Sequence, residues 1–152
     1  MVSTFVPRVL IVEARFYDRL SFELLEGCMA VLREEGIPFD SVVVPGVLEI
    51  PTAISMAMSA SKNANGVIYG GFVALGIVIK GETSHFDIVS RESTRGLVDL
   101  SIKHSLPIGN GILVVDNEEQ AWERASFSRL NRGGFAAHAV LKMIELKQNS
   151  FQ

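Results

Sequence analysis

The segment from Leu75 to Asp87 holds the residues whose types and spacing are best suited to chemistry. An apolar stretch passes through two glycines to the hydroxyl residues Thr83 and Ser84 and then to His85, where a new helical pattern begins. This order predicts a strand, a ligand loop and a helix N-terminus. Backbone N–H groups in such a loop can bind an anion, and a histidine titrates near neutral pH. The segment therefore predicts phosphate binding and proton transfer at one site, although a lone histidine can also be structural.

Two further segments carry candidate ligand residues. Phe16 stands where the first apolar segment ends, so its ring could stack on a planar heterocycle or close the top of the core. Glu49 follows Pro45 and Gly46, and it could accept hydrogen bonds from ligand hydroxyls or complement a helix dipole. Asp87 weakens the attraction of its helix end for phosphate, so a second cation is needed. The candidates are Lys80, Arg124, Arg129 and Arg132.

Apolar β-branched segments alternate with longer segments of helical period, which is typical of a parallel sheet covered by helices. The predicted strands are Arg8–Glu13, Phe39–Val44, Gly66–Val73 and Pro107–Val115, each apolar enough to be buried on both faces. The predicted helices are Asp18–Glu35, Ile50–Ala60, Ser84 or His85 to His104, Glu118–Ala125, and a last one from about Gly133. Ligands of such sheets bind at the carboxyl ends of the strands, so the loops after each strand should form the site.

Size and composition narrow the classes of protein. The 152 residues fit one compact domain, 1–152, and 14 basic against 17 acidic residues give a net charge of -3 without a basic block, so nucleic acid is not expected as a partner. No apolar run reaches the ~18 residues that cross a membrane. The N-terminus lacks a signal-peptide pattern and the single cysteine, Cys28, lies in a helical stripe, which together favour the cytoplasm. The 48% hydrophobic content suggests burial against other subunits.

No metal-ligand spacing links Cys28 with His85, His104 and His138, and no dinucleotide or nucleotide glycine motif is present. We therefore expect neither a metal nor a nicotinamide or ATP cofactor.

Several separated motifs, in order along nearly the whole chain, resemble the lumazine synthase family. They are Ala14–Asp18, Val44–Gly46 followed by Glu49–Pro51, Leu75–Gly76 through Gly81–Asp87, and Glu119–Ala121 with Glu123–Ala125. The resemblance implies a flavodoxin-like α/β fold, a three-layer α/β/α sandwich with a four-stranded, mainly parallel sheet. It also implies a cofactor-free and metal-free condensation of 5-amino-6-(D-ribitylamino)uracil with 3,4-dihydroxy-2-butanone 4-phosphate, which releases phosphate and water in riboflavin biosynthesis.

The resemblance further implies a role for each matching residue. His85 matches the catalytic histidine, and Phe16 matches the residue that stacks on the pyrimidine. The segment that holds the ribityl chain and ring is matched by Val47, Leu48 and Glu49, with Ile77, Val78 and Ile79 lining the same pocket. Phosphate-binding positions are matched by Glu82, through its backbone, Thr83 and Arg124, and Arg132 stands where the family often has lysine.

The family's site lies between adjacent subunits of a ring of five, with Arg124 supplied by the next chain. The resemblance thus implies a pentamer or a dimer of pentamers, and a functional link to riboflavin synthase. Two features depart from the family. Asn110 stands where members commonly have a phenylalanine that faces the neighbouring subunit's ligand. Residues Ser126–Leu130 stand in place of the glycine- and lysine-containing turn associated with members that build sixty-subunit shells. A non-catalytic flavin- or lumazine-binding paralogue is the alternative. A flavodoxin-like or receiver-type domain is a further alternative, but a receiver domain has an acidic cluster at the end of the first strand, where this chain has only Glu13. The loop that follows, residues 15–18, differs from the phosphate loop of flavodoxin-like domains, which is rich in Ser and Thr.

Overall fold

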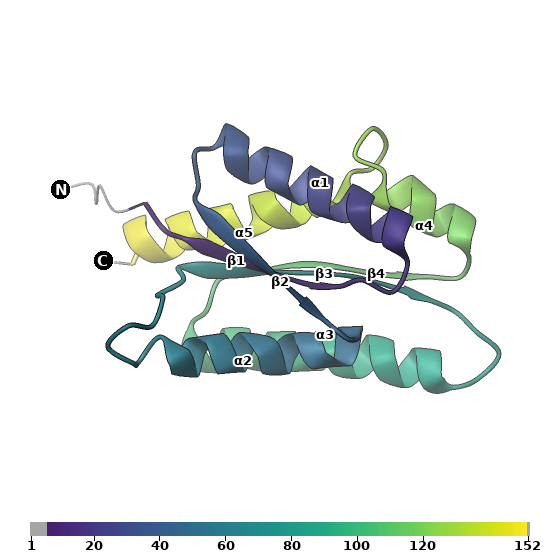
Figure 1. Cartoon of the computed structure of the whole chain (residues 1–152), viewed down its shortest axis with the longest axis horizontal. Helices are drawn as coiled ribbons and strands as arrows, with labels where there is room; N and C mark the ends of the chain where they lie inside the picture. Colours follow the sequence, from purple (N-terminus) through teal and green to yellow (C-terminus); the bar gives the residue numbers. More distant parts are fainter. Residues whose placement is uncertain (1–5, 152) are drawn as a thin grey trace.

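The structure, a computed structural model, describes residues 6–151, and its centre is a four-stranded sheet between two layers of helices (Figure 1). The strands are β1 (Val9–Ala14), β2 (Phe39–Val44), β3 (Gly71–Ile79) and β4 (Ile108–Val115). They lie in the order β2-β1-β3-β4, and all neighbours are parallel. The helical elements are α1 (Asp18–Glu34), the 3-10 turn η1 (Val47–Glu49), α2 (Ile50–Ala60), α3 (His85–His104), α4 (Glu118–Ala125) and α5 (Arg132–Asn149). The predicted three-layer, flavodoxin-like α/β fold is confirmed.

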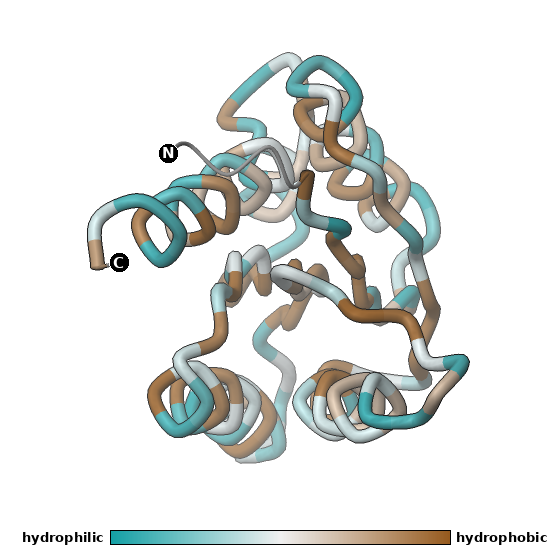
Figure 2. Tube along the Cα trace, turned by 90° about the vertical axis from the view of Figure 1, so that its left-hand side faces the viewer, coloured by the Kyte–Doolittle hydropathy of each residue, from teal (hydrophilic) through white to brown (hydrophobic). Residues whose placement is uncertain are grey.

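The central strand β1 shows how side-chain alternation builds the two layers. Val9 and Ile11 pack against α1 and α5, whereas Leu10, Val12 and Ala14 pack against η1, α2 and α3. Successive side chains of a strand point to opposite faces, so one fully buried strand supplies both cores. Figure 2 shows hydrophobic residues along the strands, between the two helix layers.

The predicted third strand, Gly66–Val73, is wrong at both ends, because β3 runs from Gly71 to Ile79. A Cβ on Gly71 would lie 2.6 Å from Val140 Cγ2, and one on Gly76 would lie 2.8 Å from Val47 Cγ2. These glycines therefore let helical side chains approach the sheet, and they do not mark turns. As a result the ligand loop before α3 is limited to residues 80–84.

The bounds of β2 are confirmed, but its expected burial on both faces is wrong. This strand lies at an edge of the sheet, and Ser41, Val42 and Val43 are exposed in the single chain. The other edge strand, β4, alternates between buried and exposed positions. The remaining predicted bounds differ from the observed ones by a single residue or agree.

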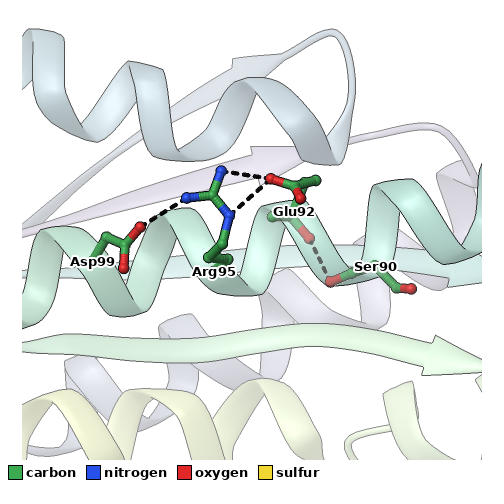
Figure 3. A network of polar contacts seen from close by, with 5 residues as sticks. Ser90, Glu92, Arg95 and Asp99 are labelled. Atoms are coloured by element: carbon green, nitrogen blue, oxygen red, sulfur yellow. Dashed lines mark hydrogen bonds and ion pairs between the residues drawn. The ribbon is translucent and has the colours of Figure 1, made fainter.

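Helix α3 places His85 at its first residue. The backbone N–H of His85 donates to Thr83 Oγ1 at 3.3 Å, whereas Ser84 makes no side-chain cap. Further along, Arg95 donates to Glu92 at 2.9 Å and to Asp99 at 2.9 Å (Figure 3). These pairs have the i,i+3 and i,i+4 spacings at which opposite charges stabilise a helix. They support the helix whose start carries the histidine.

Candidate active site

A cavity of about 490 Å³ lies at the carboxyl ends of β1, β2 and β3. The chain leaves β1 toward β2 on one side and returns through α2 to β3 on the other side of β1, so the cavity occupies the point where strand order reverses. Its volume is within the ~300–1,000 Å³ range of small-molecule sites. The walls come from Ala14, Phe16, Tyr17, residues 45–49, residues 77–79, Gly81, Thr83, His85, Phe86 and Val89.

Phe16 follows β1 and lines the cavity while remaining 76% exposed. The alternative interpretation, that this ring closes the top of the core, is therefore wrong for this chain. The Phe16 and Tyr17 rings form a T-shaped pair, with 5.0 Å between their centroids and 78° between their planes. Tyr17 itself packs beside Leu20 and Leu24 in the core. One face of Phe16 is thus free to meet a planar ligand.

The loop after β2 brings Val47, Leu48 and Glu49 to the cavity, as predicted. Val47 is buried, while Leu48 and Glu49 are exposed. The Glu49 carboxylate lies beside Gly46, since a Cβ at that position would be 2.9 Å from Glu49 Oε2. Within residues 6–151 no ion pair engages the Glu49 carboxylate. It is therefore available to accept hydrogen bonds from hydroxyl or amine groups of a ligand.

The end of β3 and the following loop form the opposite wall. Ile77, Val78 and Ile79 are strand residues at the cavity, and Thr83 and the exposed His85 line it beyond them. The strand residues thus form the apolar part of this wall, and Thr83 and His85 form its polar part. Since His85 is the first residue of α3, its imidazole stands at the N-terminal end of the helix, where the helix dipole favours an anion, and one bound anion could meet both.

Two cationic residues predicted for the site do not line this cavity. Arg124 lies in α4, and its Nη1 donates to the backbone oxygen of Gln120 at 3.3 Å. The same Nη1 is 3.7 Å from Glu123 Oε2. Arg132 begins α5, and its guanidinium lies 4.0 Å from the centroid of the Phe135 ring. In the single chain, both guanidinium groups therefore lie outside the cavity walls.

Asn110 and Glu82 also lie outside the cavity walls. Asn110 is exposed on the edge strand β4, where its Oδ1 accepts from the backbone N–H of Ile112 at 2.9 Å. Glu82 is exposed in the loop before α3, one residue before Thr83. In the single chain, therefore, neither residue forms part of the cavity wall.

Sequence reasoning missed Tyr17, Phe86 and Val89 as wall residues. Phe86 and Val89 lie three residues apart on the apolar face of α3, and both pack in the core. One face of a helix cannot be divided into core and cavity by spacing alone. Tyr17 carried a usable signal, because it is the second of two aromatic residues at a strand exit.

Within residues 6–151, no group of three or more His, Cys, Asp or Glu residues could hold a metal ion. Over the same residues, no helix is long and apolar enough to cross a membrane. Cys28 is buried in α1, and burial, with a smaller contribution from the charge of Glu13, raises the pKa of its thiol to about 12. It is therefore a packing residue and not a nucleophile.

Comparison with known proteins gives one consistent result. Residues 7–148 match the family model described as 6,7-dimethyl-8-ribityllumazine synthase. A relative of that name from Agrobacterium fabrum is 59% identical over 142 residues, covering 93% of this chain and 95% of its own. The 6,7-dimethyl-8-ribityllumazine synthase 1 of Rhizobium meliloti is 56% identical over 140 residues, covering 92% and 91%. The chain belongs to the 6,7-dimethyl-8-ribityllumazine synthase family.

Proposed function

We propose that the protein, as a single domain over residues 1–152, is a 6,7-dimethyl-8-ribityllumazine synthase of riboflavin biosynthesis. It condenses 5-amino-6-(D-ribitylamino)uracil with 3,4-dihydroxy-2-butanone 4-phosphate, without a cofactor or metal. The observation that carries the proposal is the cavity where Phe16, Glu49, Thr83 and His85 come together from three loops. The names of the relatives support an enzyme, and they give no support to a non-catalytic carrier.

In this proposal the pyrimidine occupies the β1 and β2 side of the cavity. Its ring stacks on Phe16, and Glu49 accepts hydrogen bonds from the ribityl or ring groups. Val47 and Leu48 contact the ribityl chain, and Ile77, Val78 and Ile79 form the apolar floor. In such a site the apolar floor buries the ligand, and the few polar groups fix its orientation.

The phosphate of the second substrate lies at the start of α3. Thr83 donates its hydroxyl, the backbone of Glu82 contributes a donor, and the dipole of α3 favours the negative charge. Arg124 of the adjoining chain supplies the positive charge. Arg132 is a further candidate for this role. Asn110 would reach the ligand of a neighbouring chain from β4.

The reaction requires repeated proton transfer between adjacent atoms. The pyrimidine amine attacks the ketone and water leaves to give an imine. Elimination of phosphate follows, and ring closure expels a second water. His85, exposed at the cavity, can take a proton from the attacking amine and return it to the leaving oxygen. General acid–base catalysis contributes roughly 10²- to 10⁴-fold, and alignment of two reactants can contribute more.

The proposal includes a homopentamer or a dimer of pentamers, because the site needs Arg124 from a second chain. Many large apolar side chains are exposed on the single chain, and a subunit interface would bury them. They include Val42 and Val43 on β2, Met56 on α2, and Ile88, Val98 and Ile102 on α3. We place the protein in the cytoplasm, where riboflavin synthase would consume its product.

The decisive test mixes the purified chain with both substrates and follows the absorbance of the lumazine. Formation of lumazine and of stoichiometric phosphate is expected. Tight binding of riboflavin with no product would contradict the proposal and favour the carrier. Mass by light scattering tests the assembly, where a shell of sixty subunits or a fully active monomer would contradict it.

A further inference from the structure

The buried carboxylate of Glu13 is unexpected in the fold. It stands one residue before the end of β1, is 2% exposed, and faces α1, on the same side of the strand as Val9 and Ile11. Its Oε1 accepts from Arg15 Nε at 2.7 Å. Removing a carboxylate from water costs several kcal/mol, and an apolar residue in such a position is often equally stable or better. Core stability therefore does not account for a carboxylate here.

The geometry of the loop suggests what the ion pair does. Along an extended chain, Arg15 falls on the same side as Glu13, and Phe16 falls on the cavity side with Ala14. The guanidinium returns to the strand end through its bond to Glu13, and Tyr17 is held among core residues on the other side of Phe16. Phe16 is thus flanked by two anchored neighbours while its own ring remains exposed at the cavity.

We propose that Glu13 and Arg15 form a positioning pair that fixes the loop after β1 so that the Phe16 ring is preorganised for an aromatic substrate. This inference rests on the proposed function for the nature of that substrate. Neither residue touches the ligand, since neither lines the cavity. The pair acts through Phe16, by removing the freedom that the ring would otherwise lose on binding.

The two residues of the pair differ in what their loss would cost, because only Glu13 is enclosed. Arg15 is 38% exposed and can be solvated if its partner is lost, whereas Glu13 is enclosed and cannot. Removal of Arg15 therefore leaves an uncompensated buried charge, which is the more damaging change. The conservative variant Glu13→Gln keeps the volume and an acceptor for Arg15 while it removes the charge, so it loosens the loop with little effect on the core.

The test compares Glu13→Gln with Asp40→Asn, a matched change from carboxylate to amide. Asp40 is bonded to Arg8 at the other end of the sheet, away from the cavity. For Glu13→Gln we expect the KM of the pyrimidine to rise about three- to tenfold, with kcat and the KM of the butanone phosphate within about twofold. For Asp40→Asn we expect neither KM to change.

A second readout needs no substrate. Hydrogen exchange measured by mass spectrometry should show faster exchange of residues 15–18 in Glu13→Gln, with residues 39–44 unchanged. Arg15→Lys keeps the charge but loses the planar fork, so it should show the same changes at smaller size. It replaces Glu13→Gln if that variant does not fold, because its side chain is partly exposed.

Unchanged exchange in residues 15–18 would overturn the positioning role, whatever the activity. Equal increases in both KM values, or an increase only for the butanone phosphate, would overturn it as well, because they indicate general damage or a direct phosphate contact by Arg15. An inactive wild-type protein would refute the proposed function instead, and the exchange comparison would still decide the role of the pair.

Discussion

Polar side chains at the amino ends of the strands bond to one another, whereas two of those that line the cavity at the carboxyl ends do not. At the amino ends, Arg8 donates to both carboxylate oxygens of Asp40 at 2.8 Å, and Tyr69 donates its hydroxyl to Asp40 at 2.7 Å. At the carboxyl ends, within residues 6–151, the Glu49 carboxylate and the His85 imidazole have no such partner. Polar groups that satisfy one another stabilise a fold, and those that remain free are available to a ligand.

The largest effect is expected at the carboxyl ends, from His85→Ala. Loss of proton transfer should lower kcat by about 10²- to 10⁴-fold, while substrate alignment keeps turnover measurable. Steady-state kinetics with both substrates measures it. His104→Ala, at the far end of the same helix, is the control and should be near wild type. Unchanged rates in His85→Ala would remove this residue from the mechanism.

A smaller effect is expected from Arg124→Gln, which tests whether the carboxyl end is completed by a second chain. A charged hydrogen bond to phosphate contributes about 1.5–3 kcal/mol, so the KM of the butanone phosphate should rise about 10- to 150-fold. Arg33→Gln removes one positive charge near the end of α1 and serves as the control. A raised KM for the pyrimidine alone would show that the phosphate assignment is wrong.

The fold was predictable from the sequence where it depends on local patterns, and not where it depends on contacts between distant elements. The fold followed from alternating apolar and helical segments, and the loops after β1, β2 and β3 were correctly expected to meet. The bounds of β3 were wrong because Gly71 and Gly76 resemble turn residues in a sequence, while their true role depends on Val140 and Val47 in distant elements. Tertiary contacts of this kind leave no local periodicity.

At the site, the single chain brings together most predicted residues but not Arg124, Arg132, Glu82 or Asn110. Spacing cannot reveal whether a residue serves its own chain or a neighbour. The Glu13–Arg15 pair was also beyond sequence reasoning, since a glutamate at a strand end is usually solvated. Its burial depends on how α1 covers β1.

One substitution at each end of the sheet separates stability from ligand binding. The expected change in the free energy of unfolding at the amino end is about 1 kcal/mol. Asp40→Asn should lower the free energy of unfolding by about that amount, discounted because the Asp40–Arg8 pair is partly exposed, and should leave both KM values unchanged. Glu49→Gln should do the reverse, raising the KM of the pyrimidine with the stability within about 0.5 kcal/mol. Urea unfolding at fixed protein concentration, combined with kinetics, measures both. If Glu49→Gln were the more destabilising change, the contrast would fail.

The smallest effect concerns the dependence of stability on pH, and it arises at the amino end. The bonds from Arg8 and then Tyr69 lower the pKa of Asp40 from 3.8 to about 2. Because the folded-state pKa is depressed, this stabilisation is present above about pH 4 and is lost as the pH falls toward 2. Burial, followed by the bond to Asp40, raises the pKa of Tyr69 to about 12, so its contribution is present below pH 10 and is lost as the pH rises through 12.

Between pH 5 and 9, therefore, the bonds among Arg8, Asp40 and Tyr69 should contribute a constant amount to the free energy of unfolding. Urea midpoints measured from pH 2 to pH 6 should fall on acidification by less in Asp40→Asn than in wild type, with a difference of about 1 kcal/mol or less after allowance for solvent exposure. Tyr69→Phe should in the same way reduce the loss above pH 10. Identical acid profiles for Asp40→Asn and wild type would mean that the Asp40–Arg8 bond does not hold in solution, and that the amino end is as open as the carboxyl end.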